Sequence, residues 1–481
     1  MPDGSTLNYA ELRAEVSKLG GQLRAIGINP GDRVAIVLPN GPEMAIAFLA
    51  VAVTGCAAPL NPKYRKEEFQ FYYEDLKTRA LITGTAESEI PRSANPGSIA
   101  NLTLNGKVGD LRLTADRILG DPHDGNSPLP EDIALVLHTS GTTSRPKIVP
   151  LRHRNLANSA HNIASSLSLT AADRSLNVMP LFHIHGLLAG LLAPLSVGGS
   201  VVATNGFNAF RFFSQLQEFH PSYYTAVPTM HQMILARSSS YQDAATTSGL
   251  RFVRSSSASL PPTVLEELSE LFKVPVIEAY GMTEATHQMC CNPFPPGITK
   301  PGSVGLPTGI QLTILDKEGQ SLPTNQRGEV SIRGSTVIDG YENNPEANET
   351  TFSSGWFRTG DEGYVDPDGY LFLTGRLKEQ INRGGEKISP LEIEAVLLSH
   401  EHVTQAVSFA VPHEKLGEEV AAAVVLIDGV ELSERELREF VSGSLAPFKV
   451  PKKVLFLDEL PKGPTGKVQR IGLAEQLGLE P

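Results

Sequence analysis

A loop rich in hydroxyl groups is the part of the chain best suited to chemistry. The segment VLHTSGTTSRPKIVP, residues 136–150, follows an apolar run and carries the cation Lys147 just before Ile148. Closely spaced O–H and N–H donors, a glycine and a lysine are what a phosphate group needs from a protein. The chain has no G-x-x-x-x-G-K-[ST] loop, no G-x-G-x-x-G after a strand and no G-x-S-x-G elbow. The residues alone therefore leave a phosphate-binding loop and a solvated polar turn as alternatives.

The elements around this loop alternate between helices and strands. Apolar residues recur at helical spacing over residues 12–26. Strand-like apolar runs lie at residues 133–137, 251–256 and 274–281. This alternation predicts an α/β fold with layered, largely parallel sheets. Ligands bind at the carboxyl ends of the strands in such sheets, which is where the loop of residues 139–147 falls.

Chain length and composition limit the class of protein. The 481 residues predict two or three domains, because one domain usually holds roughly 100–200 residues. A net charge of -12 argues against nucleic acid as the main partner. Three cysteines make no disulfide framework, no apolar run approaches the roughly 18 residues of a membrane span, and the N-terminus lacks a signal-peptide pattern. These features predict a cytoplasmic protein without a membrane partner.

The residue pattern of the sequence changes twice towards the C-terminus. After residue 300, strand-like runs such as QLTILD and GEVSIRG alternate with glycine and proline turns, which predicts a smaller antiparallel or barrel-like subdomain. From Arg376 the chain becomes strongly charged, and its mixed helical and strand patterns predict a separate α+β domain of ~100 residues. The segment 85–132 is poor in apolar periodicity and rich in Gly, Pro, Ser and Asn. We expect an irregular surface excursion there.

Six short motifs, taken in order, resemble one family. They are TSGTTSRPK (139–147), MPLFHIHG (179–186), EAYGMTEA (278–285), GWFRTGD (355–361), GRLKEQINRGGEKISP (375–390) and PKGPTGK (461–467). Their order is that of the AMP-forming adenylating enzymes, a superfamily that includes acyl-CoA synthetases, nonribosomal adenylation domains and firefly luciferase. The resemblance covers nearly the whole chain. It implies an adenylation domain of layered α/β sheets with a small β subdomain over residues 1–375, a hinge at 376–378 and a mobile α+β domain over 379–481.

The resemblance also implies a two-step reaction that uses ATP, Mg²⁺ and coenzyme A. A carboxylate attacks the α-phosphate of ATP to give an acyl-adenylate and pyrophosphate, and the thiol of coenzyme A then displaces AMP. Reactions of this type depend mainly on positioning and charge stabilisation. The motifs assign phosphate contacts to Thr139, Ser140, Gly141, Thr142, Thr143, Lys147 and Thr283, the Mg²⁺ ligand to Glu284, the adenine site to Glu278, Ala279 and Tyr280, and ribose contacts to Asp361 and Arg376.

The remaining motif residues are implied to serve the second domain and its movement. Lys467 resembles the lysine that reaches the forming acyl-phosphate, and Lys378 occupies the hinge position. Gly384 and Gly385 lie in the segment that resembles the loop for the thiol step, where the lack of side chains would admit a pantetheine arm. Ile148 stands where the family commonly has glycine. Either the phosphate loop turns without that glycine, or it is stiffer than usual.

Three polar residues fall where the family contacts the acid. His185, Ser257 and His287 match positions that face the acyl group or lie near it, and His183 matches a residue at the gate of the pocket and is a further catalytic candidate. Two histidines and a serine are costly beside an alkyl chain but suit a small acid that carries a second carboxylate. The motifs are also very similar to those of oxalate–CoA ligases. Oxalate or another small polar acid is therefore the expected substrate.

Several alternatives stay open at this point. If His185 or His287 is a core histidine, the substrate is a medium-chain or aromatic acid. A free-standing adenylation enzyme that loads a carrier protein is a second alternative, and a nucleotide binder without activity is a third. Retention of the catalytic lysine and of the carboxylates argues against the third. The expected partners are a small carboxylic acid, ATP and coenzyme A, and the expected assembly is a monomer or a homodimer.

Overall fold

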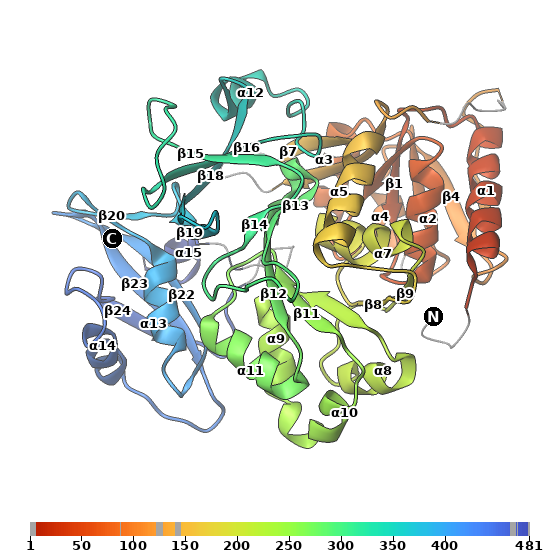
Figure 1. The fold of residues 1–481 in the computed structure, drawn as a ribbon. Helices are drawn as coiled ribbons and strands as arrows, with labels where there is room; N and C mark the ends of the chain where they lie inside the picture. Colours follow the sequence, from red (N-terminus) through yellow and green to blue (C-terminus); the bar gives the residue numbers. More distant parts are fainter. Residues whose placement is uncertain are drawn as a thin grey trace.

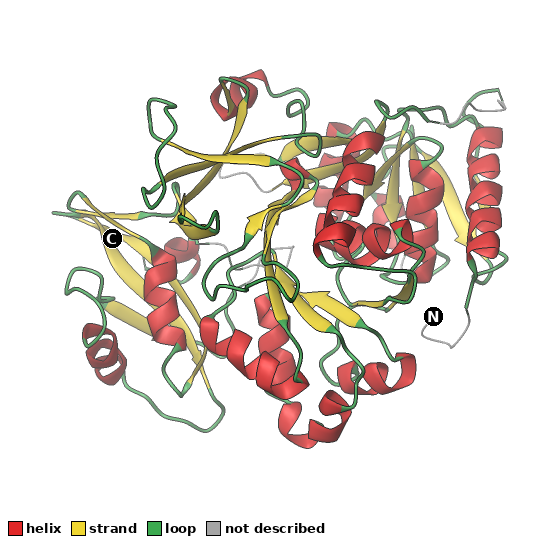
Figure 2. Ribbon diagram, in the orientation of Figure 1, coloured by secondary structure: helices red, strands yellow, loops and turns green. Residues whose placement is uncertain are grey.

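The N-terminal part of the chain forms a largely parallel sheet with helices on both faces (Figures 1 and 2). The computed structural model describes residues 6–86, 88–121, 128–139, 146–461, 468 and 470–479. The elements of this part are α1 (Tyr9–Ile26), β1 (Arg33–Val37), α2 (Pro42–Ala52), β2 (Cys56–Pro59), α3 (Lys66–Asp75), β3 (Ala80–Thr83), α4 (Glu89–Ser93), β4 (Ala100–Asn105), β5 (Arg112–Ala115), β6 (Ile133–Thr139), β7 (Lys147–Arg152) and α5 (His153–Ser166). Val34 and Ile36 of β1 pack with α1, α2 and α5, whereas Ala35 and Val37 pack with α3. The strand order of this first sheet is β5-β4-β3-β1-β2-β6-β7, with β5 and β7 antiparallel to their neighbours.

Local signals in the sequence set the ends of the helices. Asn8 caps α1 through a reciprocal pair of hydrogen bonds with Glu11, and the helix ends at Gly27, whose φ of 93° lies in the left-handed region. A second long helix of the fold begins at Pro262, where a proline removes no helical hydrogen bond. These caps explain why helix positions follow closely from the sequence.

A second sheet repeats the α/β arrangement and faces the first across a layer of helices (Figure 2). Its elements are β8 (Arg174–Asn177), α6 (Ile184–Leu187), η1 (Leu188–Leu192), α7 (Ala193–Ser196), β9 (Ser200–Ala203), α8 (Phe212–Phe219), β10 (Tyr223–Ala226), α9 (Pro228–Leu235), η2 (Ser238–Ser240), α10 (Gln242–Thr246), β11 (Phe252–Ser256), α11 (Pro262–Phe272), β12 (Val276–Met282), η3 (Thr283–Ala285), β13 (His287–Cys291) and β14 (Leu306–Pro307). The strand order is β14-β13-β12-β11-β10-β8-β9. Tyr223 and Phe252 join the large core shared with the first sheet, while Tyr224 and Val253 pack on the other face with α8 and α11. Strands β8 to β12 are parallel, so their carboxyl ends meet at one edge.

The expectation of an irregular excursion over residues 85–132 is wrong for the described part of that segment. It contains α4, and β4 extends the first sheet in parallel with β3, with β5 beside it. Leu102 and Leu104 are buried, and Asn101, Thr103 and Asn105, which alternate with them, face the other side. This is the period of a half-buried strand near the edge of a sheet. Its polar face made the segment resemble a loop.

Two smaller sheets follow, and the fold class expected from the motifs is confirmed. The third sheet is antiparallel and the fourth lies beside it, shown in blue in Figure 1. Helices α13 and α14 cover one face of the fourth sheet and α15 packs on the other. In the described part of the chain, no helix combines the length and apolarity that a bilayer span requires. The elements are β15 (Gln311–Leu315), β16 (Gly328–Arg333), α12 (Pro345–Thr351), β17 (Phe352–Ser353), β18 (Trp356–Val365), β19 (Leu371–Arg376), β20 (Ile381–Arg383), β21 (Glu386–Ile388), α13 (Pro390–Leu398), β22 (Val403–His413), β23 (Gly417–Leu426), α14 (Glu434–Ser442), β24 (Lys453–Phe456) and α15 (Leu473–Gln476).

Candidate active site

The hydroxyl-rich loop joins two strands of a hairpin. Thr139, the last residue of β6, pairs with Lys147, the first residue of β7. The loop residues Ser140, Gly141, Thr142 and Thr143 lie outside the described residues. The Nζ atom of Lys147 sits 4.4 Å from the centre of the Tyr341 ring, and burial lowers the pKa of this lysine while Glu284 opposes that shift.

Ile148 occupies an ordinary strand position. It pairs with His138 across the hairpin, and its side chain is buried in the core behind the first sheet. Its carbonyl accepts a hydrogen bond of 3.1 Å from the backbone N–H of Glu342. Extended backbone with a buried face suits a β-branched residue. A glycine is therefore not required at this position.

Glu284 lies where the first, second and third sheets approach one another. Its Oε1 atom accepts a hydrogen bond of 2.9 Å from the hydroxyl of Tyr341 and one of 3.4 Å from Thr139. The side chain is buried in η3, directly after Thr283. Burial and the neighbouring Glu284 carboxylate raise the pKa of Tyr341, so this hydroxyl stays protonated and donates. The side-chain oxygens of Glu284, Tyr341 and Thr139 therefore gather beside Lys147.

A second buried carboxylate belongs to the third sheet. Asp361 of β18 and Arg376 of β19 are cross-strand partners, with Arg376 Nε at 3.0 Å from Asp361 Oδ1. The hydroxyl of Tyr280 donates to the other carboxylate oxygen. Burial raises the pKa of Asp361 and Arg376 counters this shift. The carboxylate is thus held in one orientation, which suits recognition of two adjacent hydroxyl groups.

The segment before Tyr280 braces a neighbouring loop. Glu278 is buried, and its Oε1 atom accepts a hydrogen bond of 2.9 Å from the backbone N–H of Leu260. The carbonyl of Ala279 accepts a hydrogen bond of 2.8 Å from the hydroxyl of Ser256. Burial raises the pKa of Glu278 to about 7, with the Leu260 bond opposing the shift. The side chain of Glu278 therefore fixes the loop after β11.

The three residues expected in the acid pocket come together. The rings of His185 and His287 stack with centroids 4.8 Å apart and an interplanar angle of 26°. The Nδ1 atom of His185 lies 3.0 Å from the hydroxyl oxygen of Ser257. Both histidines are buried, and Ser257 is partly exposed with a φ of 75°. The partly exposed member of the cluster, Ser257, belongs to the loop that Glu278 braces.

Sequence reasoning missed the residue at the centre of this cluster, Arg254. Its guanidinium is fully buried and donates hydrogen bonds to Thr225, at 3.1 Å, and to Gln288, at 2.9 Å. The same guanidinium lies 3.3 Å from the Nε2 atoms of His185 and of His287. The signal was an arginine inside the otherwise strand-like run RFVRSS, where a charge has no place on either face.

The other candidate residues are placed as follows. His183 is the residue before α6, and its ring contacts that of Phe182. Lys378 is exposed just after β19. Gly384 and Gly385 form the turn between β20 and β21 with φ of 59° and 96°, so this turn itself requires glycine.

Lys467 lies outside the described residues, but the chain just after it is anchored. Arg470 pairs with Glu394 through two hydrogen bonds, of 3.0 and 2.6 Å, and with Glu379 at 2.7 Å. Glu379 follows the expected hinge residue Lys378 directly. Burial and these two carboxylates act on Arg470, whose pKa is raised. The end of the fourth-sheet domain is thereby tied to its beginning.

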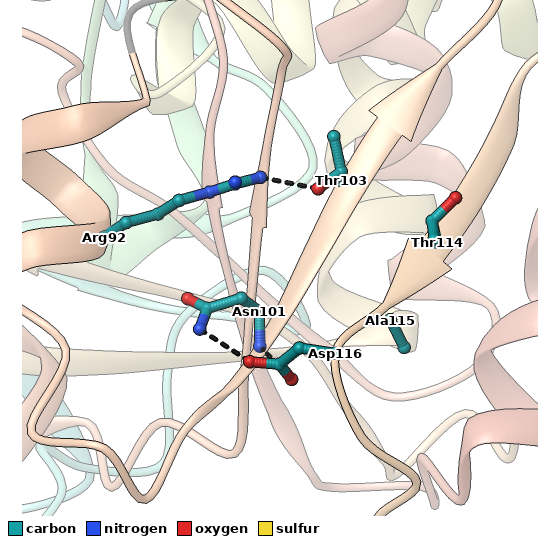
Figure 3. Close-up of a pocket in the computed structure, with 6 residues that line it drawn as sticks. All are labelled: Arg92, Asn101, Thr103, Thr114, Ala115 and Asp116. Atoms are coloured by element: carbon teal, nitrogen blue, oxygen red, sulfur yellow. Dashed lines mark hydrogen bonds between the residues drawn. The ribbon is translucent and has the colours of Figure 1, made fainter.

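A separate pocket lies at the edge of the first sheet, between α4, β4 and β5 (Figure 3). Arg92 donates to Thr103, and Asn101 donates to Asp116, so the polar groups that line it satisfy one another. This pocket contains none of the motif residues. The motif residues that the structure describes lie elsewhere, so this pocket is not the candidate active site.

Comparisons with known proteins identify the family. The chain matches the AMP-binding enzyme family over residues 2–342 and the AMP-binding enzyme C-terminal domain over residues 392–467. It is 48% identical over 478 residues to the oxalate–CoA ligase of Arabidopsis thaliana, across 96% of this chain and 92% of that protein. It is 43% identical over 477 residues to the oxalate–CoA ligase of Saccharomyces cerevisiae, across 92% of this chain and 86% of that protein. The crystal structure of ATP-bound MatB from Rhodopseudomonas palustris matches with a TM-score of 0.88 and 29% identity, across 98% of this chain and 94% of that one. The chain therefore belongs to the AMP-binding enzyme family and is an AMP-forming acid–CoA ligase.

Proposed function

We propose that this ligase activates oxalate. The observation that carries the proposal is the polar cluster of His185, Ser257 and His287, in which two buried rings lie together with a partly exposed hydroxyl. An alkyl chain placed against these groups would exclude water and offer no hydrogen bond, and each polar atom left unsatisfied in this way costs roughly 1–3 kcal/mol. The distal carboxylate of oxalate instead offers acceptors to every donor there. The oxalate–CoA ligases of a plant and a yeast, at 48% and 43% identity, support the same substrate.

The first half-reaction forms the acyl-adenylate. One oxygen of oxalate attacks the α-phosphorus of ATP, a new O–P bond forms, and the bond to the departing pyrophosphate breaks. Donors that hold the pyrophosphate lower the barrier because charge accumulates on it. In this chain the proposed phosphate contacts are Thr139, Ser140, Gly141, Thr142, Thr143, Lys147 and Thr283.

The nucleoside is proposed to bind over the end of β12 and against the third sheet. Asp361 would accept hydrogen bonds from the ribose hydroxyls, with Arg376 beside it. Tyr280 and the backbone of Glu278 and Ala279 would border the adenine. Support comes from the hydrogen bond between Tyr280 and Asp361, since it joins the adenine segment to the ribose anchor.

Glu284 is the proposed Mg²⁺ ligand. Mg²⁺ commonly binds through one or two carboxylates together with substrate phosphates, and it prefers oxygen donors. In the described residues, no group of three or more His, Cys, Asp or Glu side chains is arranged to hold a metal. A single carboxylate next to Thr139 and Lys147 fits an ion that arrives with ATP. Bound there, the ion would neutralise charge on the phosphates.

The second domain is proposed to serve both half-reactions. Residues 1–375 would form the adenylation domain and residues 379–481 the mobile domain, with the hinge at 376–378 around Lys378. Lys467 would reach the forming acyl-phosphate, His183 would stand at the gate of the acid pocket, and Gly384 and Gly385 would border the pantetheine arm of coenzyme A. The buried thiols of the three cysteines support a reducing compartment such as the cytoplasm.

The role of Lys467 can be separated by half-reaction. Lys467→Ala should slow adenylation by roughly 10²–10³-fold, by analogy with the loss of one oxyanion donor. Thioester formation from supplied oxalyl-adenylate should change far less. Single-turnover measurements of each step decide the point, and equal losses in both steps would contradict the assignment.

A panel of acids tests the substrate. Oxalate, malonate, acetate, hexanoate and cinnamate are each incubated with ATP, Mg²⁺ and coenzyme A, and both pyrophosphate and the acyl-CoA product are measured. Oxalate should give the highest kcat/KM and yield oxalyl-CoA. Robust turnover of hexanoate or cinnamate without turnover of oxalate would overturn the proposal. Adenylation of oxalate without a CoA thioester would point instead to loading of a carrier protein.

A further inference from the structure

Arg254 is a buried cation that the reaction scheme above does not use. Its side chain is fully buried in the middle of β11, and burial is the main influence lowering its pKa. In the described part of the chain no carboxylate lies within ion-pair distance, and its Nε atom has no hydrogen-bond partner. An arginine side chain stays charged in proteins and cannot accept a hydrogen bond. A buried, unbalanced charge of this kind is expensive to keep, which indicates a function.

The guanidinium determines which nitrogen of each histidine carries the proton. Arg254 Nη1 lies 3.3 Å from His185 Nε2, and Arg254 Nη2 lies 3.3 Å from His287 Nε2. Because the guanidinium only donates, each Nε2 must present its lone pair. An Nε2–H tautomer, or a protonated ring, would set two N–H groups against each other at that distance.

The hydroxyl of Thr225 reinforces this choice at His185. Thr225 Oγ1 accepts from Arg254 at 3.1 Å and lies 2.6 Å from His185 Nε2. The hydroxyl still has its own proton, and donating that proton to the ring nitrogen is compatible with the Nε2 lone pair that the guanidinium requires. His185 then carries its proton on Nδ1, where Ser257 Oγ lies 3.0 Å away and accepts it. Ser257 is left with its O–H to donate outwards.

We propose that Arg254 is a positioning residue that holds His185 and His287 as neutral Nδ1–H tautomers, so that Ser257 accepts from His185 and presents its own hydroxyl proton to the acid. The part of this inference that concerns substrate choice rests on the proposed function. The hydroxyl of Ser257, which donates outwards, matches a lone pair of a carboxylate, and the stacked rings of His185 and His287 support it. The positive charge behind them favours a distal group that is ionised over one that is neutral or apolar. Arg254 thereby selects acids with a second carboxylate without needing to touch it.

Two substitutions and a control test the inference. Arg254→Met removes the donors and the charge while keeping a long apolar side chain, a type of replacement that buried ionic groups often tolerate. Arg254→Lys keeps a donor and the charge. Arg92→Met is the matched control, because Arg92 also donates to threonine hydroxyls, at 3.0 and 2.5 Å, but in the pocket at the edge of the first sheet (Figure 3).

The decisive readout is the tautomeric state of the two rings. Long-range ¹H–¹⁵N spectra of the histidine-labelled enzyme distinguish Nδ1–H from Nε2–H, and the signals are assigned with His185→Gln and His287→Gln. We expect Nδ1–H for both rings in the unsubstituted enzyme and in Arg92→Met, a mixture or protonated ring in Arg254→Met, and partial recovery in Arg254→Lys. Nε2–H rings in the unsubstituted enzyme, or unchanged rings in Arg254→Met, would overturn the inference.

Kinetics then test the consequence for the substrate. In pyrophosphate exchange, Arg254→Met should raise the KM for oxalate by about 10- to 100-fold, because Ser257 would no longer be set to donate its hydrogen bond to the ionised distal group, with a much smaller change in kcat. The preference for oxalate over acetate should fall by a similar factor, and Arg92→Met should change neither value. An equal fall in kcat for both acids would indicate a merely structural role. If the unsubstituted enzyme ignores oxalate, the proposed function fails, yet the spectra still decide what Arg254 does to the histidines.

Discussion

Glu278→Gln should make the protein more stable at alkaline pH and leave its stability nearly unchanged in acid. Glu278 is 3% exposed, and its one hydrogen bond in the described structure is from the Leu260 N–H, at 2.9 Å. Burial penalises the charged form, so the pKa is raised from the ordinary 4.5 to about 7. Glutamine keeps a carbonyl oxygen for Leu260 and never ionises.

The sign and size of the effect follow from proton linkage. Between pH 4.5 and pH 7 the folded chain binds more protons at Glu278 than the unfolded chain, so stability falls as the pH rises. The difference between the two pKa values corresponds to roughly 3 kcal/mol once the group is ionised in both states. Between pH 5 and pH 8.5 the variant should therefore gain about 2–3 kcal/mol relative to the unsubstituted protein.

Thermal unfolding at pH 5 and at pH 8.5, followed by circular dichroism, measures this difference. The variant should unfold at nearly the same temperature as the unsubstituted protein at pH 5 and at a clearly higher one at pH 8.5. Glu266→Gln, at an exposed position of α11, is the control and should not alter the pH dependence. A gap in unfolding temperature that is equal at the two pH values would refute the reasoning, because Glu278 would then not change its protonation on unfolding in this range.

Three further substitutions probe the site and its support. Asp361→Asn should raise the KM for ATP by about 10- to 100-fold in pyrophosphate exchange, because a charged acceptor for the ribose is lost, and an unchanged KM would place the ribose elsewhere. Tyr341→Phe removes the hydroxyl that donates to Glu284 at 2.9 Å, so a Mg²⁺ titration of activity should shift by about 10-fold or more to higher concentration; an unshifted titration would separate Glu284 from the metal. Ile148→Ala should lower the free energy of unfolding by about 2–5 kcal/mol in urea titrations, since it empties a core position, whereas a stability change near zero would mean that the hairpin is not packed there.

The sequence predicted elements best where one local signal decided the structure. Helix α1 spans Tyr9–Ile26 and so contains the helical period expected over residues 12–26. The strands β6, β11 and β12 are short apolar runs, and each was expected within a residue or two. Strand β4 was missed because it lies near a sheet edge and alternates leucine with asparagine and threonine. Its identity as a strand depends on the neighbour β3, which local patterns do not reveal.

The site residues, too, were predicted where a local motif contains them and missed where only tertiary contacts bring them together. Motif order pointed to Asp361 and Arg376 as neighbours, and the structure places them in register on adjacent strands. Arg254 escaped notice because no motif contains it, and its partners come from α6, β10 and β13, which are distant in sequence. Ile148 appeared anomalous because the family commonly has glycine at this position. In the structure it pairs with His138 in a strand and its side chain is buried in the core. Tertiary contacts, which the sequence does not display, account for both cases.

One short segment, residues 278–288, sets the distances between the parts of the site. Glu278 braces the loop that carries Ser257, and Tyr280 donates to Asp361 on the third sheet. Glu284 receives hydrogen bonds from the first sheet and from Tyr341, and His287 stacks in the acid pocket. Because β12 and β13 are paired with a bulge between Tyr280 and Gly281, the segment has no freedom to slide. The side chains proposed to bind the nucleoside, the metal and the acid are thus all held by this one segment of backbone. Reaction requires the carboxylate to be aligned with the α-phosphate, and a shared rigid segment can keep that alignment.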